Sequence, residues 1–221
     1  MISIMSNTEV LNLIKNKSFK YEELTIYLHP EVYEPAEDTF QLLEVLNVKK
    51  GDTVFEIGAG CGIIALECCK NGANVLCSDI NPFAVELTRR NYDENKALMK
   101  GKFETRKGDL FQVLTLSERF DIIIFNPPYL PTKPKDLVGG SGWFDKAVDG
   151  GDDGLKIIEF FINGLQKHLA QNGQGYFVFS SLSDRKKLET YISKKGFKKE
   201  IKSTIRYDDE VLDVYCIGFK K

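Results

Sequence analysis

Histidine and cysteine are scarce in this chain of 221 residues, which contains two histidines and five cysteines. The cysteine count is odd, and no two cysteines have the C-x-x-C spacing of a zinc or redox motif. We therefore interpret the cysteines as small buried hydrophobic residues, predict no metal site and expect a cytoplasmic protein.

Long apolar runs and an excess of one charge are also missing. No apolar stretch approaches the ~18 residues that a transmembrane helix needs, and the first residues lack the basic and apolar regions of a signal peptide. The 30 Lys and Arg residues are balanced by 32 Asp and Glu residues, so the net charge is −2. This balance argues against binding to long nucleic acid by phosphate neutralisation. It does not exclude binding of nucleic acid through a local basic patch.

Strand and helix patterns alternate along most of the chain. Helical patterns separate apolar runs typical of buried strands at 53–57, 74–79, 102–107, 120–125 and 173–180, and a hairpin pattern follows at 197–205 and 211–219. The pattern predicts an α/β fold with a doubly wound, mostly parallel, seven-stranded Rossmann-like sheet whose last strand is antiparallel. We expect residues 1–30 to form an amino-terminal extension, with a short amphipathic segment at 10–14 and a strand at 24–28. Residues 31–221 should form a single domain.

The strand Phe120–Phe125 ends abruptly in Asn126-Pro127-Pro128-Tyr129. Two prolines remove two backbone donors, so this corner cannot continue the ladder and is held at the carboxyl edge of the sheet, where α/β folds bind ligands. If a planar –NH2 group lay on the Tyr129 ring, the Asn126 side-chain oxygen and the Pro127 carbonyl could each accept one of its hydrogens. The nitrogen lone pair would then point toward an electrophile such as a methyl sulfonium. We predict that Asn126, Pro127 and Tyr129 are catalytic.

A glycine-rich turn follows the strand at 53–57 and leads into a helix predicted at 63–71. Gly58 and Gly60 let the backbone approach a ligand, but Ile63 breaks the dinucleotide pattern G-x-G-x-x-G. Glu56, just before the turn, would attract an amino group and repel a pyrophosphate. The pattern therefore favours an amino-acid-bearing nucleoside.

Two further acids follow predicted strands. Asp79 has the spacing of a carboxylate that accepts both ribose hydroxyls. Asp109 could accept from an adenine amino group while Leu110 packs on the ring, although an isolated acid after a strand is also typical of a turn or a cap.

Two segments allow more than one interpretation. Glu31–Phe40 predicts a capped amphipathic helix with Pro35 in its first turn, and residues 33–39 could also cover the glycine turn as a lid. Residues 130–151 are rich in proline and glycine and contain the only tryptophan, Trp143. We predict a long loop that grips the substrate.

From about residue 31 to residue 219, the chain resembles the class I S-adenosylmethionine-dependent methyltransferases with an Asn-Pro-Pro-Tyr signature. The segment Val32-Tyr-Glu-Pro-Ala-Glu-Asp-Thr-Phe40 is similar to the short, archaeal and eukaryotic type of HemK-like glutamine methyltransferases. These enzymes methylate the glutamine of the Gly-Gly-Gln motif in class 1 release factors, often with a small zinc-binding activator subunit in a heterodimer. The resemblance implies an S-adenosylmethionine site formed by Tyr33, Pro35, Thr39, Glu56, Gly58, Gly60, Asp79, Ile80, Asp109, Leu110 and Asn126.

The sequence is also compatible with other methyl acceptors and with another class of protein. The same corner could accept a base amino group of RNA or DNA, or a lysine amine. A non-catalytic subunit that keeps the fold to bind a partner would usually have lost the cofactor acids or the amide corner, and both are kept here.

Overall fold

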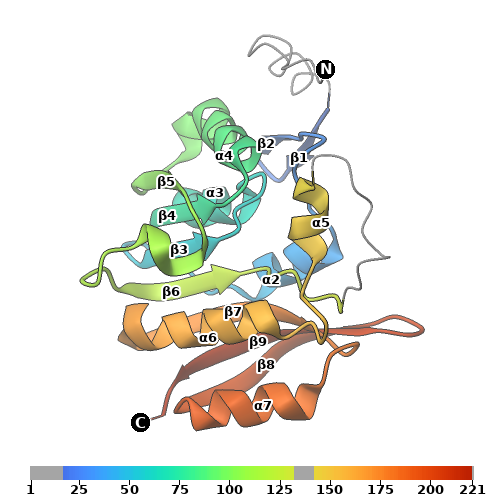
Figure 1. The fold of residues 1–221 in the computed structure, drawn as a ribbon. Coiled ribbons are helices and arrows are strands. Elements are labelled where there is room, and N and C mark those ends of the chain that lie inside the picture. The colour runs from blue at the N-terminus through green and yellow to red at the C-terminus, as the bar shows by residue number, and fades with distance from the viewer. Residues whose placement is uncertain (1–16, 132–141, 221) are drawn as a thin grey trace.

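The computed structural model describes residues 17–131 and 142–220, and its centre is a seven-stranded sheet with helices on both faces (Figure 1). The strands of the sheet lie in the order β5-β4-β3-β6-β7-β9-β8, and a separate two-stranded sheet pairs β1 with β2. The strands are β1 Ser18–Tyr21, β2 Leu24–Tyr27, β3 Thr53–Ile57, β4 Asn74–Asp79, β5 Phe103–Lys107, β6 Phe120–Phe125, β7 Leu169–Ser180, β8 Phe197–Arg206 and β9 Val211–Phe219. The helices are α2 Glu37–Val45, α3 Ile63–Lys70, α4 Pro82–Asn95, α5 Trp143–Val148, α6 Lys156–His168 and α7 Arg185–Lys194, with short 3-10 turns η1 Lys96–Leu98 and η2 Leu110–Val113.

Pairing directions confirm the predicted fold class. Strands β5, β4, β3, β6 and β7 pair in parallel, whereas β9 pairs antiparallel with both β7 and β8. The terminal hairpin therefore places its second strand inside the sheet and its first strand at the edge. Among the described residues, no helix is long and apolar enough to cross a membrane.

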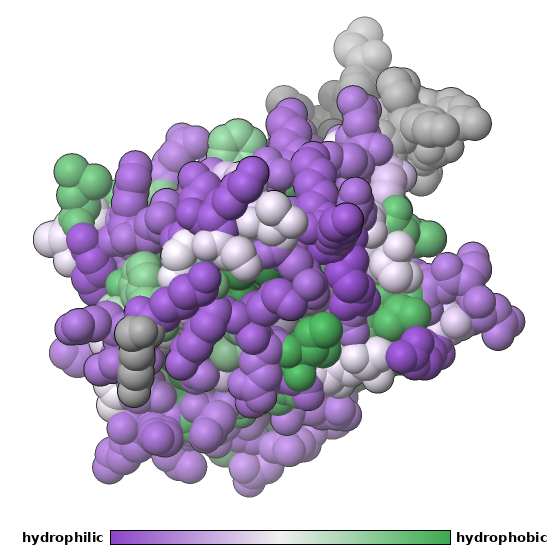
Figure 2. Space-filling model, turned by 90° about the horizontal axis from the view of Figure 1, so that it is seen from below, coloured by the Kyte–Doolittle hydropathy of each residue, from purple (hydrophilic) through white to green (hydrophobic). Residues whose placement is uncertain are grey.

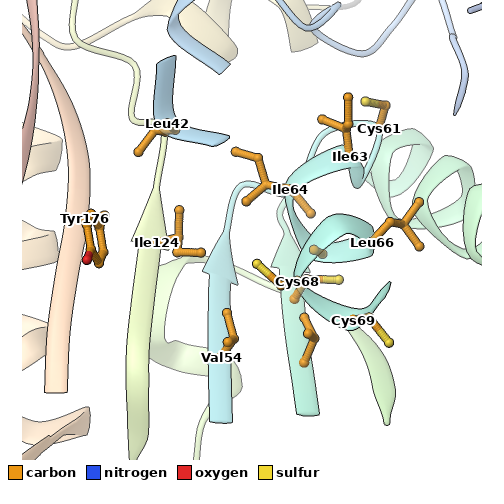
Figure 3. Packing of buried hydrophobic residues seen from close by; sticks show 14 of the residues in the cluster. Leu42, Val54, Cys61, Ile63, Ile64, Leu66, Cys68, Cys69, Ile124 and Tyr176 are labelled. Atoms are coloured by element: carbon orange, nitrogen blue, oxygen red, sulfur yellow. The ribbon is translucent and has the colours of Figure 1, made fainter. Parts of the chain in front are cut away.

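The two faces of the sheet bury different sets of side chains, because neighbouring residues of a strand point to opposite faces. Ile122 and Ile124 of β6 join one apolar cluster with α2 and α3, while Ile123 and Phe125 join the other with α6 and α7. Figure 3 shows part of the first cluster, where Ile124 lies below Leu42 of α2, with Tyr176 of β7 on one side and Ile64 of α3 on the other. Both faces of β6 are thus covered from Ile122 to Phe125, which explains the continuous apolar sequence of this part of the strand.

The β1–β2 hairpin packs on α4. Asn91 of α4 accepts from the Tyr27 amide at 2.9 Å and donates to the carbonyls of Tyr27 and Cys61 at 3.1 and 2.8 Å. Asn95 likewise exchanges two hydrogen bonds with the backbone of Thr25, each at 2.8 Å. The predicted strand near residue 24 is confirmed, β1 was not predicted, and the segment at 10–14 lies outside the described residues. The domain boundary at residue 30 stays a prediction.

Four sequence predictions of element bounds were wrong in detail, and one of them is the strand expected at 173–180, which begins at Leu169. The helix expected from Glu31 begins at Glu37, because Ala36, which follows Pro35, is extended (φ −125, ψ −168). The long loop at 130–151 contains the short helix α5, and the helix expected at Asp153 or Gly154 begins at Lys156. Gly154 has φ +67, a left-handed conformation that delays the helix.

The Lys-rich helix α7 lies on a mainly hydrophilic face, seen from below in Figure 2. Only Leu188 and Ile192 of this helix are buried, and both join the cluster under α6. The arrangement fits the predicted solvated face.

We expect Asn91→Ala to lower the free energy of unfolding by roughly 3 kcal/mol, because the Tyr27 and Cys61 backbone groups would be left without partners. Urea denaturation checks this. Glu94→Ala on the exposed side of the same helix is the matched control and should change stability by less than about 0.5 kcal/mol. If the Asn91 variant lost no more unfolding free energy than the Glu94 variant, Asn91 would not be stabilising the contact between the hairpin and α4.

Candidate active site

The candidate site lies where the order of strands reverses. The chain runs from β3 outward through β4 to β5, and then returns to β6 on the other side of β3. Ile57, the last residue of β3, is opposite Phe125, the last residue of β6, so Gly58 and Asn126 leave the sheet at the same level. A crevice outside the carboxyl ends of the strands at such a reversal is the usual ligand site of an α/β fold.

A cleft of about 480 Å³ occupies this position. This volume is within the range of small-molecule sites. All of the site residues predicted from the sequence line the cleft: Tyr33, Pro35, Thr39, Glu56, Gly58, Gly60, Asp79, Ile80, Asp109, Leu110, Asn126, Pro127 and Tyr129. The structure thus brings them together, while their individual roles stay predictions.

The glycine turn fits closely against its surroundings. Gly62 is the N-cap of α3 with φ +84, and a Cβ atom there would lie 2.8 Å from Thr88 Cγ2. The Gly60 amide donates to Asp79 Oδ2 at 2.9 Å, and the Asn81 amide donates to Asp79 Oδ1 at 2.8 Å. These bonds fix the Asp79 carboxylate against the turn.

Glu56 is buried inside β3, and its Oε2 has no hydrogen-bond partner. Burial raises the pKa of this carboxyl well above its usual range, and the nearby Asp79 adds to the effect, while the Ala65 amide opposes it. Burial also raises the pKa of Asp79, against the amides of Gly60 and Asn81. An unpaired buried carboxylate is costly, so this oxygen is suited to a cationic ligand group.

At the corner, Asp38 collects hydrogen bonds from the predicted catalytic side chains. Asn126 Nδ2 donates to Asp38 Oδ2 at 3.0 Å, and the Tyr129 hydroxyl donates to the same oxygen at 3.1 Å. Asn126 Nδ2 also lies 3.5 Å from Thr39 Oγ1. Asn126 Oδ1 is buried and has no partner.

Residues 31–39 cover the glycine turn as well as starting α2. Asn81 Nδ2 donates to the Glu31 carbonyl at 2.6 Å, and a Cβ atom on Gly60 would lie 3.9 Å from both the Tyr33 carbonyl and Val32. The segment therefore lies over the glycine turn, as the lid interpretation expected, whereas its helix begins only at Glu37.

The far side of the cleft has a strained residue. Leu110 has φ +45, in the left-handed region that is uncommon for a non-glycine residue. It begins η2, and the preceding Asp109 is the N-cap of that turn, with its carboxylate accepting from Gln112 at 3.3 Å. Asp109 thus occupies the N-cap position, without a capping hydrogen bond from its side chain to the backbone, and also lines the cleft. Strain of this kind is often kept at functional sites.

Asp38 was not predicted as part of the site, and the segment at 130–151, which was predicted to grip the substrate, was not predicted to contain the helix α5. Asp38 was given no role of its own, although it lies next to Thr39 in the segment that carries the resemblance. Trp143 and Lys146 of α5 line the cleft, and Lys146 Nζ lies 4.5 Å from the centre of the Trp143 ring. The unusual tryptophan was the signal for this segment, but its helical conformation was not predicted.

Comparison with known proteins agrees with this geometry. A model of the methyltransferase small domain family matches residues 23–141, which is more than half of the chain. "Putative protein N5-glutamine methyltransferase MJ0928" of Methanocaldococcus jannaschii is 39% identical over 194 residues, covering 87% of this chain and 94% of that protein. "eRF1 methyltransferase catalytic subunit mtq2" of Schizosaccharomyces pombe is 30% identical and covers 87% of each chain. The solved Encephalitozoon cuniculi Mtq2–Trm112 complex contains a chain with the same fold, with a TM-score of 0.65, 21% identity, and 86% of this chain and 99% of that chain covered.

The cleft at the strand reversal and these matches define a class I S-adenosylmethionine-dependent methyltransferase. The chain is an enzyme, and its cofactor is S-adenosylmethionine. Within this class, it belongs to the HemK-like family. The residues present fit the cofactor, because the unpartnered Glu56 oxygen can receive its cationic amino group.

Gly154 packs closely against the Asn-Pro-Pro-Tyr corner. A Cβ atom on this residue would lie 2.1 Å from Ser183 Oγ and 2.5 Å from the Tyr129 carbonyl oxygen. The backbone amide of Gly150 also donates to the Leu130 carbonyl at 3.0 Å. The segment after α5 therefore packs directly against the residues that follow Asn126.

We expect Gly154→Ala to destabilise the protein by roughly 2–4 kcal/mol, since left-handed strain and overpacking against Tyr129 add together. Gly51→Ala is the matched control, because Gly51 has φ +92 with no atom within 4 Å of the added Cβ and should show the strain alone. Urea denaturation of both variants gives the difference. Equal losses would mean that the contact with Tyr129 does not constrain the corner.

Proposed function

We propose that this enzyme methylates the side-chain amide of the glutamine in the Gly-Gly-Gln motif of a class 1 translation release factor. The observation that carries the proposal is the orientation of Asn126: its amide nitrogen donates to Asp38 and lies 3.5 Å from Thr39 Oγ1, and its carbonyl oxygen is left without a partner. The names of the two relatives, a protein N5-glutamine methyltransferase and an eRF1 methyltransferase subunit, support this acceptor.

We assign the cofactor contacts as follows. Glu56 would hold the amino group, Asp79 the ribose hydroxyls, and Asp109 with Leu110 the adenine. Tyr33, Pro35, Thr39, Gly58, Gly60, Ile80 and Asn126 would complete the site. The bound cofactor supplies an electrophilic methyl group on sulfur.

The corner residues would orient the target amide. Asn126 Oδ1 and the Pro127 carbonyl each accept one hydrogen of the planar –NH2 group, while the ring of Tyr129 supports it from one side. Two accepted hydrogen bonds localise the nitrogen lone pair, and orientation of this kind supplies a large part of the rate. Asn126 Oδ1 is closed to solvent in the free protein, so the target amide reaches it only after neighbouring side chains of the cleft wall move aside.

No strong base is needed at the nitrogen. The Tyr129 hydroxyl stays protonated because burial, together with Asp38, raises its pKa. Both Asp38 oxygens already accept hydrogen bonds. The proton of the amide can therefore leave after the methyl group has been transferred.

We further propose a small zinc-binding activator subunit as a heterodimer partner, supported by the pairing of Mtq2 with Trm112 in the solved complex. A cytoplasmic location is supported by five buried free cysteines. We place the methyltransferase domain at residues 31–221, with residues 1–30 as its extension.

The proposal is tested by transfer of a radiolabelled methyl group to a purified release factor and to its Gly-Gly-Gln→Gly-Gly-Ala variant, each with and without the activator. We expect label on the first protein only. No label on either protein would contradict the release factor as acceptor. RNA, DNA bases and lysine-containing proteins would then be the acceptors to examine.

Asn126→Ala should lower turnover at least ~10³-fold, because one of the two acceptors for the target amide is lost. Cofactor affinity, measured by calorimetry, should change much less, since most of the proposed cofactor contacts remain. Near-normal turnover would rule out the proposed mechanism.

Glu56→Gln should weaken S-adenosylmethionine binding roughly 10–100-fold, the usual contribution of a hydrogen bond between charged groups. Because the pKa of Glu56 is raised, lowering the pH protonates this carboxyl earlier than an exposed one. Affinity should therefore fall as the pH drops through that raised pKa, and the variant should lose this part of the pH dependence. Calorimetry at several pH values measures both effects.

Glu44→Gln on the exposed side of α2 is the control for the loss of one negative charge, and its affinity should match that of the wild type. Equal affinities for the Glu56 and Glu44 variants would show that Glu56 does not hold the amino group.

A further inference from the structure

The Asp38 carboxylate is buried beneath the corner, with 3% of the residue exposed. Its Oδ1 accepts from the Thr39 amide at 2.6 Å and from the Thr39 hydroxyl at 3.2 Å. Its Oδ2 accepts from Asn126 at 3.0 Å and from Tyr129 at 3.1 Å, and the Tyr33 hydroxyl lies 3.3 Å from the same oxygen. Asp38 therefore links the lid segment to both side chains of the corner.

The Asp38 carboxylate determines which end of the Asn126 amide is left without a hydrogen-bond partner. A carboxylate accepts hydrogen bonds and cannot donate them, so the –NH2 end of Asn126 must face it. A flipped amide would place Oδ1 against the Asp38 oxygen at about the same 3.0 Å, where two acceptors repel each other. The carbonyl end of Asn126 is thus kept away from Asp38.

The same carboxylate also sets the position of the Tyr129 ring. Its hydroxyl group donates to Asp38 Oδ2, the oxygen that holds Asn126, so one atom fixes the two side chains relative to each other. Hydrogen bonds to an ionised group are stronger than those between neutral groups, which makes the arrangement well suited to hold a defined geometry.

We propose that Asp38 is a positioning residue for methyl transfer, acting through Asn126 and Tyr129 without touching the acceptor. It turns the Asn126 carbonyl toward the target amide and holds the Tyr129 ring beside it. This inference deepens the proposed function and rests on it for its kinetic consequences, whereas the orientation of the Asn126 amide can be measured in the free enzyme.

Asp38→Asn keeps the size of the side chain but replaces one acceptor oxygen by a donor. The new –NH2 group at position 38 then faces either the Thr39 amide or the side chains of Asn126 and Tyr129. In the second case, Asn126 can accept a hydrogen bond from this group only if its Oδ1 turns toward position 38. We expect the kcat for methyl transfer to fall roughly 10²-fold, with a much smaller change in the KM for S-adenosylmethionine.

Exchanging the two side chains should rescue part of this loss. In the double variant Asp38→Asn with Asn126→Asp, the new amide at position 38 donates to a carboxylate at position 126. That carboxylate keeps a second oxygen for the target amide, and the net charge is unchanged. We expect a higher kcat than for Asp38→Asn alone. Glu37→Gln removes a neighbouring, exposed charge in the same helical turn and should leave kcat unchanged.

Nitrogen-15 NMR of the free protein provides a measurement that needs no acceptor. The side-chain amide signals of Asn126 are assigned by their absence in Asn126→Ala. In the wild type, the proton directed to the Asp38 carboxylate should lie downfield of ordinary asparagine signals, and Asp38→Asn should shift it upfield. Glu37→Gln should leave it in place.

The outcomes separate the two proposals. An Asn126 signal that does not move in Asp38→Asn, or a wild-type kcat in that variant, would overturn the positioning role. A double variant no more active than Asp38→Asn, with an otherwise native spectrum, would also count against it. If the wild type fails to label the release factor but the Asn126 signal moves, the acceptor is wrong and the orientation by Asp38 stands.

Discussion

The parallel pairing of β3 with β6 is the constraint on which the rest of the site depends. Their register places Ile57 opposite Phe125, so the glycine turn and the Asn-Pro-Pro-Tyr corner emerge together at one edge of the sheet. A shift of this register by one residue would exchange the faces of β6 and bury the wrong side chains in both clusters. The apolar cores on the two faces thus hold the geometry of the cleft, and some of their residues, such as Ile57, Ile64 and Phe125, also line it.

Polar atoms without partners show where this protein gives up stability for binding. Glu56 has a folded-state pKa above its unfolded value, so protonation stabilises the native state and this stabilisation is lost as the pH rises through the unfolded and then the folded pKa. Above the folded pKa the ionised carboxylate opposes folding, and a cation that pairs with it removes the cost. The cleft is, in this sense, incomplete without a ligand.

The sequence predicted the sheet and the position of the site because both depend on local patterns. Apolar runs marked the strands, and turn residues at the strand ends marked Glu56, Asp79 and Asn126. Asp38 could not be found in this way, since its role arises from contacts with residues 88 and 91 positions later. Helix starts were misplaced because Ala36 is extended and because Gly154 is left-handed and packs against Tyr129, a contact that the local sequence does not reveal.

Two buried carboxylates in one cleft are given different tasks by their partners. Glu56 keeps an unpartnered oxygen, so it can still bind a charged group that enters the cleft. Asp38 has both oxygens occupied by donors from its own chain, so it is suited to hold other side chains in place. An amide nitrogen is too weak a nucleophile to gain much from attraction alone, and its alignment depends on acceptors with fixed directions. Asp38, with hydrogen bonds to both of its oxygens, fixes the direction of the Asn126 carbonyl. An Asn126 side chain that rotated freely would not have a fixed direction.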